Sequence, residues 1–245
     1  MKLSTKSIII YAIPLLMGGV INSLSIGYVV YKIGEHKQIL YKLGLIELSD
    51  CDRADYWSVQ AWSKSIEKLN LQCDVCFFGH SQIYGADFKK AFPNKSIVEL
   101  GYPGDNLEGM LRRVDQIRSV HPEQIFIMAG TNSLHYKKRL FEQLYSDLII
   151  KVKKQNPNAS LYLFTILPQC NGLMGDTTLN ALIRERNTFI NSIAKSDICV
   201  GIVDIYSLYS NENGCLMKEV TDDGLHLLPN GYSLCYQSIS SIINK

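Results

Sequence analysis

Short apolar runs that alternate with longer segments of helical period restrict the fold of this 245-residue chain more than any other feature. Strands that are apolar along most of their length are buried on both faces, and a helix between successive strands makes those strands parallel. The sequence therefore predicts an α/β fold with three layers, α/β/α, around a central five-stranded parallel sheet. The predicted strands are 74–78, 96–100, 124–129, 161–166 and 200–205, and the predicted helices are 83–92, 106–120, 138–155, 178–194 and a last helix from about Pro229.

The composition fits a globular enzyme and excludes several other classes of protein. Apolar residues make up 47% of the chain and charged residues 20%, which excludes a disordered chain and a multi-pass membrane protein. A net charge of +2 gives no electrostatic surface for nucleic acid, so we expect no nucleic-acid partner. The seven cysteines are an odd number, which is not the pattern of a disulfide-stabilised scaffold.

Residues 7–31 contain no charged side chain, and Lys6 and Lys32 border them. About 20 apolar residues of helix cross the hydrocarbon core of a membrane, so the sequence predicts one N-terminal transmembrane helix at 7–31. Two alternatives remain. A cleaved signal peptide has a shorter apolar region, of about 7–15 residues, and a buried helix of a soluble domain would show a polar face.

This anchor divides the chain into four predicted parts. They are a short tail at 1–6, the transmembrane anchor at 7–31, a juxtamembrane linker with an N-terminal helix at 32–70, and a folded domain at 71–245. Lysines flank the apolar run in nearly equal number, so the positive-inside rule gives little orientation. The simpler topology places the short tail inside. We therefore expect a single-pass membrane protein whose domain lies on the periplasmic or extracellular side.

Several polar and glycine-rich segments lie in the predicted loops. In an open parallel sheet, ligands bind beyond the carboxyl ends of the strands. The segments that follow the first three predicted strands are GHSQ (79–82), GYPGDN (101–106) and GTNS (130–133), and DDGLH (222–226) lies before the last helix. A hydroxyl, glycine backbone, a side-chain amide and an acid–histidine pair thus fall on predicted loops, and the first three fall on the binding edge.

These residue types are the parts of an acyl-transfer site. A serine hydroxyl needs an adjacent base, and Ser81 at a strand-to-helix turn has a candidate base in His226, which Asp223 could orient. The neighbouring helix N-terminus favours negative charge. The backbone N–H groups of Ser81 and Gly104 and the side-chain amide of Asn132 could donate hydrogen bonds to a tetrahedral oxyanion.

In this order the four segments resemble the blocks of the SGNH hydrolases, also called the GDSL esterase/lipase family. The resemblance covers roughly residues 71–245. It implies that Ser81 is the nucleophile, that His226 is the base with Asp223 as its partner, and that Ser81, Gly104 and Asn132 form the oxyanion hole. The matching blocks are DVCFFGHSQIYG (74–85), ELGYPGDN (99–106), MAGTNSL (128–134) and DGLHLLPNGY (223–232).

The glycine and asparagine blocks look most like the subgroup of platelet-activating-factor acetylhydrolase type, which removes short acyl groups. The resemblance also implies a flavodoxin-like sheet and no cofactor. One position departs from the family pattern, because His80 stands where the family usually has an aspartate. That residue is a neighbour of the nucleophile and not a triad member, but it could alter the hydrogen bonds or the charge of the turn.

No metal site is expected. Cys73 and Cys76 form a Cys-x-x-Cys pair, but residues three apart on a strand point to opposite faces, so buried free thiols are the expected state. The histidines lack the paired spacing of metal ligands.

The sequence therefore predicts a membrane-anchored serine esterase that hydrolyses short-chain acyl esters, such as acetyl esters, of glycans or lipids through an acyl-Ser81 intermediate. An acyltransferase on envelope glycans would use the same residues and pass the acyl group to a sugar hydroxyl. A catalytically silent binding domain is the other alternative, and His80 is the feature that favours it. The expected partners are an acyl ester substrate and a membrane.

Overall fold

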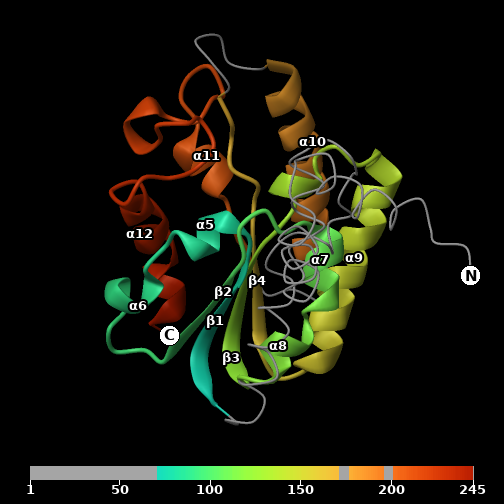
Figure 1. Ribbon diagram of the computed structural model, residues 1–245, viewed down its shortest axis with the longest axis vertical. Coiled ribbons are helices and arrows are strands. Elements are labelled where there is room, and N and C mark those ends of the chain that lie inside the picture. The colour runs from blue at the N-terminus through green and yellow to red at the C-terminus, as the bar shows by residue number, and fades with distance from the viewer. Residues whose placement is uncertain (1–70, 171–176, 196–200, 245) are drawn as a thin grey trace, which may run out of the picture. The chain divides into compact units, whose positions relative to one another are not determined.

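A five-stranded, fully parallel sheet forms the centre of the computed structural model, which describes residues 71–170, 177–195 and 201–244 (Figure 1). The strand order is β2-β1-β3-β4-β5, which is the order of flavodoxin-like folds. The predicted three-layer fold is thereby confirmed. The strands are β1 (Cys73–Gly79), β2 (Ile97–Gly101), β3 (Pro122–Met128), β4 (Ser160–Phe164) and β5 (Gly201–Val203).

Helices cover both faces of this sheet (Figure 1). The helices α7 (Leu107–Arg112), α8 (Asp115–Arg118), α9 (Lys138–Gln155) and α10 (Thr177–Ala194) lie on one side, and α5 (Ser81–Tyr84), α6 (Phe88–Ala91), α11 (Ile205–Tyr209) and α12 (Tyr232–Ile243) lie on the other. Short 3-10 turns occur at η2 (Thr131–Ser133) and η3 (Lys218–Val220).

The side chains of the central strands alternate between two hydrophobic cores. In β1, Cys76 and Phe78 belong to the core under α7–α10, and Val75 and Phe77 belong to the core under α5, α6, α11 and α12. Phe77 stacks on Phe88 of α6 with ring centroids 3.6 Å apart. Because β1 is buried on both faces, it is apolar along most of its length, as the sequence pattern predicted.

Two predicted helices are each broken into two short helices. The predicted helix at 83–92 ends early because the backbone N–H of Gly85 caps α5, and the carboxylate of Asp87 then starts α6 by accepting a hydrogen bond from Lys90 N at 3.0 Å. The predicted helix at 106–120 is interrupted between α7 and α8, where Arg113 leaves helical geometry. The last helix begins at Tyr232, later than predicted, and α11 was not predicted.

The predictions for residues 1–70 lie outside the described residues, and this includes the transmembrane helix at 7–31 and the linker at 32–70. Over the part of the chain that the structure does describe, no helix combines the length and the apolar composition that a membrane span needs.

Candidate active site

The three loops of the predicted binding edge leave the sheet from adjacent strands at the same level. Gly79 at the end of β1 pairs with Gly101 at the end of β2 and with Met128 at the end of β3. The backbone N–H of Tyr102 donates to the carbonyl oxygen of Gly79 at 3.0 Å, which joins the first two loops directly. The loops that carry Ser81, Gly104 and Asn132 therefore start side by side at the carboxyl edge of the sheet.

Ser81, His226 and Asp223 form a continuous chain of hydrogen bonds. Ser81 is the first residue of α5, and its Oγ lies 3.0 Å from Nε2 of His226. The other ring nitrogen of His226, Nδ1, lies 2.6 Å from Oδ2 of Asp223. The structure thus brings together three residues that the sequence separates by up to 145 positions.

The protonation of Asp223 determines which ring nitrogen of His226 carries the proton. Partial burial by itself would raise the pKa of the Asp223 carboxyl, but hydrogen bonds from the side chain and backbone of His226 and from the backbone of Leu225 outweigh it and hold this pKa well below its usual value. An ionised carboxylate can only accept hydrogen bonds, so Nδ1 of His226 carries the proton. Nε2 is then the acceptor for the Ser81 hydroxyl.

Backbone contacts on several sides hold the loop that carries His226. Oδ1 of Asp223 accepts hydrogen bonds from the backbone N–H groups of Leu225 at 2.9 Å and His226 at 2.7 Å. Gly224 lies in the left-handed region with φ +74°, and its carbonyl oxygen accepts from Cys170 N at 2.8 Å. A Cβ atom at Gly224 would overlap the carbonyl oxygen of Cys170.

We expect Gly224→Ala to lower kcat by roughly 100-fold, because the loop must move away from Cys170 and a displacement of about 1 Å at a reacting group costs about that much. Steady-state hydrolysis of 4-nitrophenyl acetate measures the loss. Gly214→Ala is the matched control, since Gly214 has φ +71° but its added Cβ would lie 3.5 Å from the nearest atom, Arg184 Nη1. Equal values of kcat in the two variants would contradict this prediction.

The two predicted oxyanion loops are joined by hydrogen bonds. The side-chain amide of Asn132 donates to the carbonyl oxygen of Asp105 at 2.8 Å. Asp105 directly follows Gly104, which has φ +74°. The backbone N–H of Leu107 donates to Ser133 Oγ at 2.9 Å. These bonds hold the loop of Gly104 against the loop of Asn132.

A buried arginine that the sequence analysis did not single out connects the same loops to the strand ends. Arg113 Nε donates to Oδ2 of Asp105 at 2.6 Å, and both side chains are less than a tenth exposed. Its Nη2 donates to the carbonyl oxygen of Gly79 at 2.6 Å and its Nη1 to that of Leu100 at 3.0 Å. Arg113 is part of an Arg-Arg pair on a segment of helical period, and an arginine on the buried side of an amphipathic pattern was the signal available in the sequence.

His80 is a buried, uncharged residue directly before Ser81, the predicted nucleophile. It is 1% exposed. Its Nδ1 accepts a hydrogen bond from the backbone N–H of Gln82 at 3.4 Å, and this bond caps the N-terminus of α5. Burial, followed by the nearby His226 and Arg113, lowers the pKa of His80 to about 3. The imidazole therefore adds no charge to the turn at neutral pH and cannot replace His226 as a base.

The buried, uncharged His80 predicts a pH dependence of stability. Between pH 6.5 and about 3 the unfolded chain binds a proton at this position and the folded chain does not, so stability is lost as the pH falls through this range. We expect a contribution of about 1.4 kcal/mol per pH unit, measured by urea unfolding between pH 6 and 4.5. His80→Asn should lose this part of the slope and keep the capping acceptor, while His135→Asn, at an exposed histidine, serves as the control. An unchanged slope in His80→Asn would contradict the assignment.

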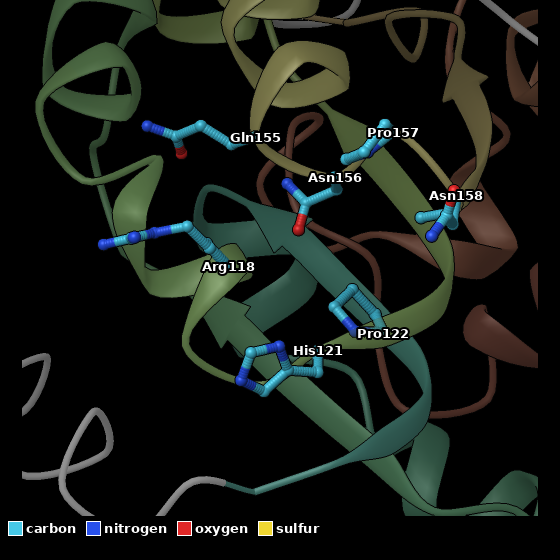
Figure 2. A pocket seen from close by; sticks show the side chains of 8 residues that line it. Arg118, His121, Pro122, Gln155, Asn156, Pro157 and Asn158 are labelled. Carbon is cyan, nitrogen blue, oxygen red and sulfur yellow. The ribbon is translucent and has the colours of Figure 1, made fainter.

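The remaining candidates do not build a second catalytic site in the described residues. Cys73 and Cys76 are buried free thiols, as expected. Within residues 71–170, 177–195 and 201–244, no group of three or more histidine, cysteine or acidic side chains could hold a metal ion. A cavity of about 230 Å³ lies at the opposite, amino edge of the sheet, where residues that include Arg118, His121 and Asn156 line it (Figure 2).

Comparisons with solved structures support the fold. A Streptococcus pneumonia protein whose name relates it to platelet activating factor is 22% identical, with a TM-score of 0.66 over 75% of this chain and 92% of that chain. A GDSL-like lipase from Bacteroides thetaiotaomicron VPI-5482 is 19% identical, with a TM-score of 0.64 over 76% and 97%. The acetyl xylan esterase AlAXEase is 20% identical, with a TM-score of 0.57 over 69% and 98%.

Among curated proteins, an N-acylneuraminate cytidylyltransferase from Escherichia coli O18:K1:H7 (strain RS218 / NMEC) is 26% identical over 181 residues. This match covers 69% of the present chain, which spans only 40% of the length of that relative.

The sequence model of the GDSL-like lipase/acylhydrolase family matches residues 71–234, which include all four blocks that the sequence analysis identified. The resemblance to SGNH hydrolases is thereby confirmed. The chain belongs to the GDSL-like lipase/acylhydrolase family and is a serine hydrolase.

Proposed function

We propose that this hydrolase removes short acyl groups, such as acetyl, from esters of glycans or lipids through an acyl-enzyme on Ser81. The hydrogen-bonded chain from Ser81 Oγ through His226 to Asp223 is the observation that carries this proposal, because it supplies a hydroxyl, a base and an orienting carboxylate in line. The base and the acid are each about half exposed, which leaves room for a substrate to reach them.

In the first half of the reaction, Ser81 Oγ attacks the ester carbonyl carbon while Nε2 of His226 takes the hydroxyl proton. Asp223 holds Nδ1–H of His226 and stabilises the imidazolium that forms. The backbone N–H groups of Ser81 and Gly104 and the amide of Asn132 donate to the oxyanion. An amide nitrogen carries two hydrogens, so the bond from Asn132 to Asp105 orients the amide and leaves one hydrogen to donate.

The tetrahedral intermediate then collapses, and the alcohol leaves with the proton from His226. This completes the first half and leaves the acyl group on Ser81. Water then takes the place of the alcohol. His226 removes a proton from this water as it attacks the acyl carbon, and the acid departs when Ser81 Oγ regains its proton. Ser81 and His226 therefore serve both acylation and deacylation.

Covalent labelling of the full-length protein with a fluorophosphonate probe tests the nucleophile. The probe needs an activated serine and little else of the substrate. Intact mass should show one adduct on the wild-type protein and none on Ser81→Ala. An adduct that persists in Ser81→Ala, or a folded wild-type protein that takes no adduct, would overturn the proposed role of Ser81.

The names of similar proteins support the proposed acyl group and alcohol. Two of the solved relatives are esterases for acetylated carbohydrates, an acetyl xylan esterase and an acetyl-xylooligosaccharide esterase, and the curated relative is named for an N-acylneuraminate. A panel of acetylated xylooligosaccharide, O-acetylated N-acylneuraminate and an acetylated phospholipid should contain the preferred substrate. Preference for a charged, water-soluble thioester over all three would contradict this substrate class.

We also propose that residues 7–31 anchor the protein in a membrane as a single span, with the hydrolase domain on the periplasmic or extracellular side. The absence of charge over these 25 positions supports the proposal, as does the lysine on either side. The full-length protein should stay in the membrane fraction after extraction with alkaline carbonate. Deletion of residues 1–31 should move the esterase activity to the soluble fraction. Protease added to spheroplasts, which have an intact cytoplasmic membrane and an accessible outer face, should digest the domain, and protection of the domain would overturn the proposed side.

A further inference from the structure

Gln82 lies directly after the proposed nucleophile and contacts the loop of the proposed base. The residue is 2% exposed. Its Nε2 donates to the carbonyl oxygen of Leu225 at 2.7 Å, and its Oε1 accepts from the backbone N–H of Leu227 at 3.3 Å. These two backbone groups belong to the residues on either side of His226. The side chain of Gln82 therefore holds the backbone on both sides of the imidazole.

The partners of Gln82 leave its amide one orientation. A carbonyl oxygen such as that of Leu225 can only accept, so the nitrogen of the amide must face it. Oε1 then faces two donors, the N–H of Leu227 and the hydroxyl of Tyr232 at 3.1 Å. The Tyr232 hydroxyl also lies 2.9 Å from the backbone oxygen of Gln82, so its single proton is shared between these two acceptors of the same residue.

This contact does something that the other contacts of the base loop do not. Asp223 orients His226 from within the same loop, three positions away, so it cannot set the distance between that loop and α5. Gln82 is in α5 with Ser81 and reaches a segment 143–145 positions away in the sequence. Its bonds are buried or partly buried, whereas the bond between Ser81 and His226 is exposed to solvent.

We propose that Gln82 is a positioning residue that sets the separation between Ser81 Oγ and His226 Nε2 by binding the backbone on both sides of His226. This inference rests on the proposed roles of Ser81 and His226. Gln82 does not touch the reacting atoms, and its effect on the reaction passes through the geometry of those two residues.

Gln82→Met keeps the length of the side chain and removes both hydrogen bonds. We expect kcat for 4-nitrophenyl acetate to fall roughly 10–100-fold and the rate of fluorophosphonate labelling to fall by the same factor, because both depend on the contact between serine and base. KM should stay within about threefold of the wild-type value. His226 acts in both acylation and deacylation, so both steps should slow by a similar factor. All rates are measured well below the unfolding midpoint of each variant.

Gln82→Glu gives a pH signature that loss of packing alone would not. As a carboxylate, the new side chain places a negative oxygen against the carbonyl oxygen of Leu225. As a carboxylic acid, it can donate to Leu225 O and accept from Leu227 N, as the amide does. The ratio of kcat in Gln82→Glu to kcat in the wild-type protein should therefore rise as the pH falls from 8 to 5, and the same ratio for Gln82→Met should stay flat.

Asn156→Asp is the matched control. Asn156 is also a buried amide, 8% exposed, and its Nδ2 donates to the carbonyl oxygen of Val152 at 2.9 Å, but it lies by the cavity at the amino edge of the sheet (Figure 2). This variant should lose stability in urea unfolding and keep kcat within about twofold of the wild type.

Full kcat in both Gln82 variants would overturn the positioning role, and so would an equal loss of kcat in Asn156→Asp. Either result leaves the proposed function standing if Ser81→Ala is inactive and unlabelled. Activity and labelling that survive in Ser81→Ala would instead overturn the proposed function itself.

Discussion

Asp223→Asn should lower kcat by roughly 10⁴-fold, the largest effect that we expect from a change of so few atoms. Oδ1 can still accept from the backbone N–H groups of Leu225 and His226 after the change, so the loop keeps its main-chain contacts. The amide NH2 then takes the place of Oδ2 and faces Nδ1 of His226. Two donors cannot share a hydrogen bond, so the ring moves its proton to Nε2 and can no longer accept from Ser81.

Steady-state hydrolysis of 4-nitrophenyl acetate and the rate of fluorophosphonate labelling measure this loss together. Asp222→Asn is the control. Asp222 is the adjacent exposed acid, so this substitution makes the same change of charge one position away. It should keep kcat within about twofold of the wild type. A loss of less than tenfold in Asp223→Asn would show that the carboxylate does not control the tautomer of His226.

Arg113→Met should lower the free energy of unfolding by about 3–5 kcal/mol. The change leaves the carboxylate of Asp105 buried without its cation, and it removes the donors to the carbonyl oxygens of Gly79 and Leu100. Taking two charges out of water is costly, so the pair adds little by itself. Breaking it is severe because one charge stays behind.

Urea unfolding at pH 7 measures the difference against two references. Arg112→Met is the control, since the neighbouring Arg112 is 35% exposed and its ion pair with Glu108 is 3.7 Å long, so we expect a loss of at most about 1 kcal/mol. The double variant Arg113→Met/Asp105→Asn should be more stable than Arg113→Met, because it removes the uncompensated charge. Equal losses in Arg113→Met and Arg112→Met would contradict the importance of the buried pair.

The strands and the acid–histidine loop were predictable because each follows from local pattern. A strand such as β3 is apolar over most of its length, and Asp223 and His226 stand three residues apart just before a helix. The resemblance to a family then joined the separate blocks into one site. Candidate catalytic residues of this kind are visible in a sequence because their residue types are rare in combination.

Gln82 and Arg113 could not be found in the same way. Gln82 acts on residues 143–145 positions away, and Arg113 acts on the carbonyl oxygen of Gly79, which is 34 positions away. The partners that link these two side chains to such distant segments are backbone atoms of Leu225, Leu227 and Gly79, and backbone atoms carry no identity in the sequence. The breaks after α5 and α7 were missed for a related reason. Single capping contacts such as the one at Asp87 override a helical pattern that continues on either side.

The distance along the chain between Ser81 and His226 also has a consequence for biosynthesis. Ser81, the proposed nucleophile, follows β1, the first strand of the sheet, whereas His226, the proposed base, comes 145 residues later, after all five strands have been made. Chains are translated from the N-terminus, and a domain generally folds as a unit. A growing chain thus carries its serine without a base through most of translation. From the proposed roles of Ser81 and His226, we expect esterase activity only after the segment that contains His226 has been added and has docked, so a prematurely terminated product should be inactive.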